Sequence, residues 1–115
     1  MGIFNFFGKA KRLDPDEQVI VQLQKAGSNL SLPHKIEFFL YFPTQQAAEE
    51  SASKVVSKGF QVEVKNAATG SEWLCLATKK MIPSLQNLQE IRVYFDKLTA
   101  SLGGNYDGWG TEVEN

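Results

Sequence analysis

The stretch FQVEVKNAATGSEWLCLATK, residues 60–79, decides the fold of this chain. Apolar and polar residues alternate over residues 60–65, which predicts a strand with one buried face and one polar face. Residues 66–71 contain a glycine and have the length of a hairpin connection, and residues 73–79 are again rich in strand-forming side chains. The stretch therefore predicts two neighbouring antiparallel strands.

The segments on either side of this hairpin supply one more central strand and three helices. Residues 36–42, IEFFLYF, are dense in β-branched and aromatic side chains and end at a proline, which predicts a strand. Capping residues, together with apolar residues at spacings of three and four, predict helices over residues 15–26, 45–58 and 84–102. Residues 106–113 form a last extended segment.

The predicted elements follow the order of a ferredoxin-like fold. A first helix precedes β-α-β-β-α-β, which is the split βαβ arrangement. We therefore predict an α+β fold, with a four-stranded antiparallel sheet, helices on one face and an extra N-terminal helix. Strand alternation points one apolar set toward the helices: Ile36, Phe38, Leu40, Phe42, Val62, Val64, Leu74 and Leu76. It points a second set toward the open face of the sheet: Phe39, Tyr41, Trp73 and Cys75.

Length and composition limit the classes of function. The chain has 115 residues, 43% hydrophobic and 22% charged, and a net charge of −1. These values fit a single domain, which we place at residues 13–115. One cysteine excludes an internal disulfide, and one histidine argues against a zinc site. We expect a cytoplasmic, non-enzymatic protein with no cofactor, no metal and no catalytic residues, and the near-neutral charge argues against direct binding of nucleic acid.

Residues 1–12, MGIFNFFGKAKR, form an N-terminal arm of distinct composition. The arm combines bulky apolar side chains with Lys9, Lys11 and Arg12. Its charges follow the apolar stretch, whereas a secretory signal carries them before a longer stretch. Such a segment is typical of a flexible arm or of weak contact with a membrane surface. Both interpretations stay open.

A motif near the C-terminus carries a resemblance to a known family. YDGWGT, residues 106–111, is followed by Glu112, and a Gly-Phe pair at Gly59 and Phe60 opens the second strand. With the long amphipathic helix before the motif, this pattern resembles the bacterial family called regulator of ribonuclease E activity B (the RraB-like family) over most of residues 14–114. The resemblance implies a ferredoxin-like fold and a cytoplasmic, non-catalytic protein that binds the endoribonuclease ribonuclease E and reduces its activity.

The resemblance also implies that the motif binds a protein partner. Its residues are Tyr106, Asp107, Gly108, Trp109, Gly110, Thr111 and Glu112. The residue types support two interpretations. In the first, the two aromatics anchor an interface, and Asp107, Glu112 and Glu114 attract a basic partner. In the second, the glycines mark a kink in the last strand that packing of Trp109 holds in place.

The open face of the predicted sheet suggests an alternative function. Exposed aromatics on a four-stranded sheet stack bases in RNA-recognition modules. The third strand lacks the motif of those modules, however, and glutamates balance the lysines on this face. We expect the face to be covered, either by Val19, Ile20 and Leu23 of the first helix or by a second copy of the chain in a homodimer. The alternative is therefore an RNA-binding or membrane-peripheral adaptor that uses the open face or the N-terminal arm.

Two single residues have side chains that often carry chemistry. His34 has no second histidine and no cysteine near it in the sequence, so we predict a surface histidine. Cys75 lies between two leucines without an adjacent base, so we predict an inert thiol.

Overall fold

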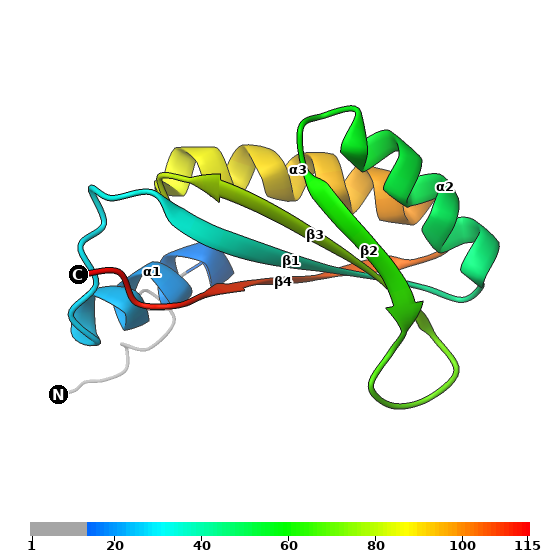
Figure 1. Cartoon of the computed structure of the whole chain (residues 1–115), viewed down its shortest axis with the longest axis horizontal. Helices are drawn as coiled ribbons and strands as arrows, with labels where there is room; N and C mark the ends of the chain where they lie inside the picture. The colour runs from blue at the N-terminus through cyan, green and yellow to red at the C-terminus, as the bar shows by residue number, and fades with distance from the viewer. Residues whose placement is uncertain (1–13) are drawn as a thin grey trace, which may run out of the picture.

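The computed structural model, which describes residues 14–115, contains three helices and four strands in the predicted order (Figure 1). The helices are α1 (Pro15–Lys25), α2 (Gln45–Val56) and α3 (Leu85–Ser101). The strands are β1 (His34–Phe42), β2 (Gln61–Asn66), β3 (Trp73–Met81) and β4 (Asn105–Thr111). The predicted N-terminal arm, residues 1–12, lies outside the described residues, so its two interpretations remain predictions.

The strands form one antiparallel sheet in the order β2-β3-β1-β4. This is the strand order of a ferredoxin-like fold, in which the first strand is central. α2 packs on β1, β2 and β3, and α3 packs on β1 and β4. Figure 1 shows both helices on the same side of the sheet. The predicted α+β fold is confirmed.

Local sequence explains where the helices begin. The N-caps are Asp14, Thr44 and Ser84, and each side-chain oxygen accepts a hydrogen bond from a backbone N–H in the first helical turn. These residue types are preferred at N-caps because they satisfy backbone donors that the helix leaves unpaired. Pro15 follows the first of these caps, where its missing N–H costs nothing.

The core lies between the sheet and the helices. In β1, every second residue from His34 to Phe42 is fully buried. Phe38 contacts Phe95 of α3 edge-to-face, with ring centroids 5.5 Å apart, and it contacts Phe60 at 5.6 Å. This aromatic cluster joins the central strand to the longest helix.

The predicted orientation of the side chains of β3 is wrong, because each side chain from Trp73 to Leu76 lies on the opposite face of the sheet from the one predicted. Trp73 and Cys75 lie on the helix side, because Cys75 pairs with the buried Leu40 of β1. Leu74 and Leu76 therefore lie on the open face of the sheet. The cause is that residues 73–77 of this strand are all apolar, so the alternation of apolar and polar residues does not show which of them face the helices. Pairing with β1 determines their orientation instead.

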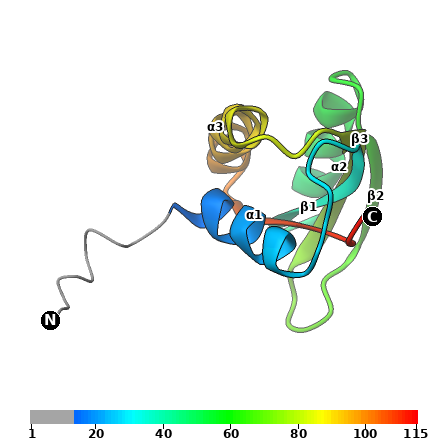
Figure 2. The ribbon, with the colours of Figure 1, turned by 90° about the vertical axis from the view of Figure 1, so that its left-hand side faces the viewer.

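The first helix does not cover the open face of the sheet, contrary to the prediction. α1 contacts α3 and β4 (Figure 2). Its residues Val19, Ile20 and Leu23 join the same core as the other two helices. A buried ion pair between Asp16 and Arg92 of α3 holds α1 in this position.

Candidate functional site

The candidate motif, residues 106–112, includes most of β4 and contains a β-bulge. Two consecutive residues of β1 pair with Gly108 and Tyr106, so Asp107 has no partner in the β1–β4 ladder. Gly108 has a φ of +117°, a conformation that side chains rarely permit. In a regular strand, residues 106 and 109 would lie on opposite faces, but the bulge turns both Tyr106 and Trp109 toward the helices. The predicted kink in this strand is confirmed.

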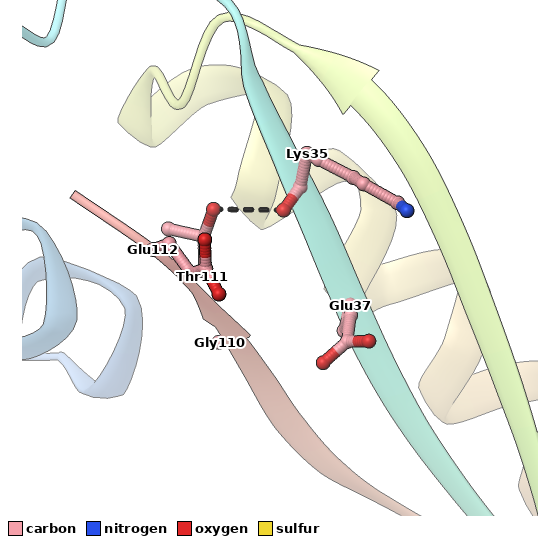
Figure 3. Close-up of a pocket in the computed structure, with 5 residues that line it drawn as sticks. All are labelled: Lys35, Glu37, Gly110, Thr111 and Glu112. Carbon is pink, nitrogen blue, oxygen red and sulfur yellow. Dashed lines mark hydrogen bonds between the residues drawn. The ribbon is translucent and has the colours of Figure 1, made fainter. Parts of the chain in front are cut away.

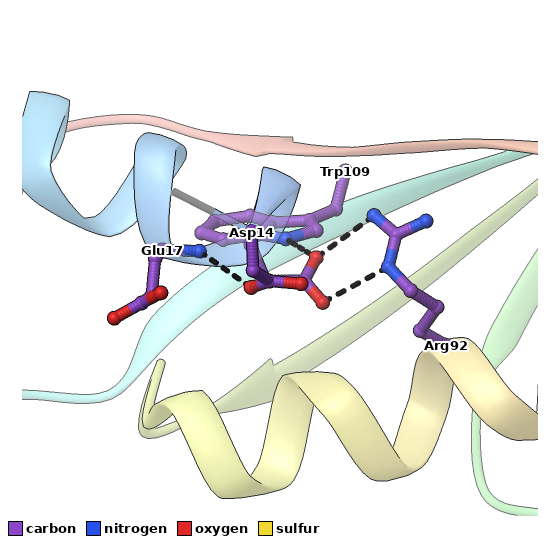
Figure 4. Close-up of polar contacts among 5 residues, drawn as sticks. Asp14, Glu17, Arg92 and Trp109 are labelled. Atoms are coloured by element: carbon purple, nitrogen blue, oxygen red, sulfur yellow. Dashed lines mark hydrogen bonds and ion pairs between the residues drawn. The ribbon is translucent and has the colours of Figure 1, made fainter. Parts of the chain in front are cut away.

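A fully buried carboxylate connects this strand to two helices. Asp16 of α1 has no exposed surface. Its Oδ1 accepts hydrogen bonds from Trp109 Nε1 at 3.0 Å and from Arg92 Nη2 at 2.9 Å (Figure 4). Its Oδ2 accepts a third hydrogen bond from Arg92 Nε at 3.0 Å. The Arg92 guanidinium therefore binds the carboxylate through two parallel hydrogen bonds, a geometry that is stronger than a single contact.

The same arginine lies over the ring of Tyr106. Its Cζ is 5.1 Å from the ring centroid. Hydrogen bonding to Asp16 raises the pKa of Arg92, and burial raises the pKa of Tyr106. Tyr106 and Trp109 are only 9% and 8% exposed, so neither ring presents an aromatic surface to a partner. A partner that binds this motif must contact its other residues.

We expect Tyr106→Phe to raise the free energy of unfolding by about 1 kcal/mol. The Tyr106 hydroxyl is buried and has no hydrogen-bond partner within residues 14–115. An unsatisfied buried hydroxyl carries a desolvation penalty that phenylalanine avoids. Urea denaturation would measure the change, with Tyr94→Phe as a control at a partly buried tyrosine of α3. A Tyr106→Phe variant less stable than the parent would contradict this reading of the site.

The exposed part of the motif borders a hollow at the seam between β1 and β4. The cavity measures about 350 Å³ and is lined by Lys35, Glu37, Gly110, Thr111 and Glu112 (Figure 3). Thr111 Oγ1 donates a hydrogen bond to the backbone oxygen of Lys35 at 2.8 Å, which joins the two strands there. A hydrogen bond between the two strands therefore stabilises one side of the hollow, and charged side chains line it.

A second hollow lies at the other end of the same seam. It measures about 250 Å³ and is lined by the connection between β2 and β3 together with residues of the seam: Tyr41, Ala67, Ala68, Thr69, Glu72, Asn105 and Asp107. Asp107, the unpaired residue of the bulge, is exposed here. We call the strip of β1 and β4 that joins the two hollows the β1–β4 seam.

Gly110 leaves the backbone of the seam uncovered. It pairs with Glu37 of β1, and a Cβ added to it would meet no atom of the described residues within 4 Å. Its φ is outside the region that favours glycine. Glycine also weakens a strand relative to other residues, so neither the surrounding space, nor φ, nor strand stability accounts for a glycine here. The bare backbone is instead suited to close approach by another chain.

His34 is buried, so the prediction of a surface histidine is wrong. Its Nδ1 lies 2.8 Å from the backbone oxygen of Leu32, and its Nε2 lies 2.6 Å from Ser28 Oγ. The backbone N–H of Glu114 donates to the same Ser28 oxygen at 3.0 Å. β1 begins two residues earlier than predicted, and strand alternation then turns His34 inward. The histidine therefore fastens the C-terminal segment to the start of the sheet.

The described residues offer little to a metal ion or to nucleophilic chemistry. Within residues 14–115, no group of three histidine, cysteine or acidic side chains is placed to hold a metal. Burial raises the pKa of the Cys75 thiol to about 11, so the thiol stays protonated near neutral pH. The same part of the chain has no helix long and apolar enough to cross a membrane.

Neither Asp16 nor Arg92 is among the predicted site residues, although the sequence contains a signal for both. Asp16 lies two turns before Leu23, on the apolar stripe of its helix. Arg92 lies between Leu88 and Phe95 on the buried stripe of α3. Opposite charges on the buried stripes of two helices indicate that the helices pair through them.

Comparison with known proteins places these features in a family. The chain matches the family model described as regulator of ribonuclease activity B over residues 13–111. The matched range includes every helix and strand of the structure and ends at the last residue of β4. A comparison with curated proteins gives no significant match.

Proposed function

The chain belongs to the RraB family, the regulators of ribonuclease activity B, and we propose that it binds a ribonuclease of the ribonuclease E type and lowers its activity. The family match carries this proposal, because it extends over every helix and strand that the structure describes. On this proposal the chain acts by binding and catalyses no reaction itself.

The contact surface that we propose is the β1–β4 seam. The buried members of the motif, Tyr106, Gly108 and Trp109, would hold β4 in its kinked form. The exposed and half-exposed members would contact the partner: Asp107, Gly110, Thr111 and Glu112. The hollows at both ends of the seam and the bare backbone at Gly110 support this division of roles.

The charges along the seam favour a basic segment of the partner. Glu37, Asp107 and Glu112 are exposed there, against the single cation Lys35. Acidic residues at the rim of an interface mainly raise the association rate and select the partner. A basic segment of the ribonuclease would therefore be steered toward the seam.

The polar contacts of His34 support a non-catalytic role. Both ring nitrogens are within hydrogen-bond distance of groups of the same chain, Leu32 and Ser28. A general base needs a ring nitrogen that reaches the substrate. The only histidine of the chain therefore has a structural role on this proposal.

We expect the double variant Asp107→Asn/Glu112→Gln to bind the ribonuclease about three- to ten-fold more weakly, since exposed charge pairs contribute about 0.2–1 kcal/mol each. Both substitutions preserve side-chain size at exposed positions, so the melting temperature should not change. Titration calorimetry at low salt would measure the dissociation constant. The matched control is Glu49→Gln/Glu50→Gln, which removes the same charge from exposed positions of α2.

Two outcomes would contradict the proposed surface. The first is a double variant that binds as tightly as the parent. The second is retention of the parent chain on immobilised RNA that weakens as salt rises, without binding to the ribonuclease. This second result would favour the RNA-binding alternative, because phosphate contacts are lost with increasing salt.

A further inference from the structure

The two edges of the sheet are protected to different degrees. β4, one edge, contacts α1 and contains a bulge. Within residues 14–115, β2, the other edge, pairs with β3 only, in an unbroken register. Its other main contacts are with α2, which packs on its face. Every residue of β2 is exposed or half-exposed. An edge of this kind presents unpaired backbone groups to other chains.

The charges of β2 do not protect this edge from a second copy of itself. Lysines and prolines usually discourage edge pairing, and β2 contains Lys65 but no proline. Glu63 lies two residues before Lys65 on the same face, and its carboxylate is 3.7 Å from the ammonium nitrogen. The two side chains are 63% and 49% exposed, so this ion pair is loose. In an antiparallel copy, the order Glu-x-Lys becomes Lys-x-Glu.

We propose that β2 pairs antiparallel with β2 of a second copy of this chain, about a two-fold axis at Val64. Glu63 of each copy then lies directly opposite Lys65 of the other copy. Directly opposite residues of antiparallel strands have side chains close enough to interact, and opposite charges there are stabilising. The two copies of Val64 face each other on the helix side of the sheet, where Val64 is now half-exposed.

The other registers are less favourable. An axis at Glu63 places the two copies of Glu63 opposite each other, and an axis at Lys65 does the same for the lysines. Like charges directly opposite each other are destabilising. A two-fold axis between two residues would place each residue opposite its neighbour in the other copy. Neighbouring side chains point to opposite faces of a strand, so the helix side of one copy would then meet the open face of the other. Only the axis at Val64 combines matched faces with two pairs of opposite charge.

The proposed dimer leaves the other edge of each sheet free. In each copy, β3 and β1 separate β2 from β4. The β1–β4 seam therefore remains open on both copies, and the dimer would present two copies of it. This inference does not depend on the function proposed above, since it follows from β2 alone.

Sedimentation equilibrium with the full chain, from about 10 µM to about 1 mM, would test the proposal, since an interface this small suits a weak dimer. We expect a monomer–dimer equilibrium. Glu63→Lys and Lys65→Glu should each weaken dimerisation by at least about ten-fold, because each places two like-charge pairs in the interface. The double variant Glu63→Lys/Lys65→Glu exchanges the charges and should return the dimerisation constant to within about three-fold of the parent.

Matched controls separate the proposed register from a general effect of charge. Glu90→Lys and Lys97→Glu make the same charge changes at exposed positions of α3 and should leave dimerisation unchanged. Thermal melting of every variant would confirm that the domain remains folded. Three results would overturn the proposal: a monomer at every concentration, a dimer that neither single variant weakens, or a double variant that fails to restore dimerisation.

Discussion

Replacing Arg92 with methionine is expected to lower the free energy of unfolding by about 3–5 kcal/mol. The variant leaves the carboxylate of Asp16 fully buried, and among residues 14–115 the indole of Trp109 is then the one side chain shown to donate a hydrogen bond to it. A buried charge that loses its partner keeps its desolvation penalty without the compensating attraction. Chemical denaturation would measure the loss. Lys97→Met, which removes a cation from an exposed position of the same helix, should change stability by less than about 0.5 kcal/mol.

A second variant shows whether Arg92→Met loses stability because it leaves a buried charge unpaired or because it loses packing contacts. Asp16→Leu/Arg92→Met replaces both charges by apolar groups and should recover most of the stability that Arg92→Met loses, because apolar pairs often replace buried ion pairs without loss. A single Arg92→Met variant within about 1 kcal/mol of the parent would contradict the account of how α1 is held.

The second large effect is expected for Gly104→Ala, which should lower the free energy of unfolding by more than about 3 kcal/mol or prevent folding. Gly104 lies between α3 and β4. A Cβ added there would overlap the backbone oxygen of Tyr41 and would lie 2.6 Å from Cδ1 of Phe42. Phe42 is fully buried in a close-packed core, so its ring has no space to move.

Gly110→Ala is the matched control for this substitution. The added methyl group meets no atom of residues 14–115 within 4 Å, so stability should stay the same or rise slightly. Melting temperatures of the two variants, measured side by side, would test the difference. Equal melting temperatures would show that the close approach at Gly104 does not constrain the fold.

The sequence predicts most of the fold because its strongest signals are local. The N-caps at Asp14, Thr44 and Ser84 and the apolar spacing of each helix depend only on neighbouring residues. The orientation of the side chains of β3 depends on more than neighbouring residues. Residues 73–77 are apolar on both faces of the strand, so only pairing with β1 determines which of them face the helices. The prediction for His34 is wrong for a related reason, since the exact start of a strand determines which face its first residue takes.

The candidate site is less predictable than the fold. The glycines of β4 indicate a kink, but the direction of Tyr106 depends on where the bulge falls in the register with β1. The partner of Trp109 is Asp16, which is distant in the sequence and lies on another element. Contacts of this kind require the arrangement of α1, α3 and β4 in space. Local patterns therefore identify the motif without showing which of its side chains are buried.

The rate of RNA cleavage by the ribonuclease E of the same organism, measured with increasing amounts of the purified chain, tests the proposed function most directly. We expect the cleavage rate to fall as the chain is added and to level off at saturation. The variant Asp107→Asn/Glu112→Gln should require more protein for the same effect, whereas Glu49→Gln/Glu50→Gln should not. A cleavage rate that stays constant with the chain in large excess would contradict the proposed function.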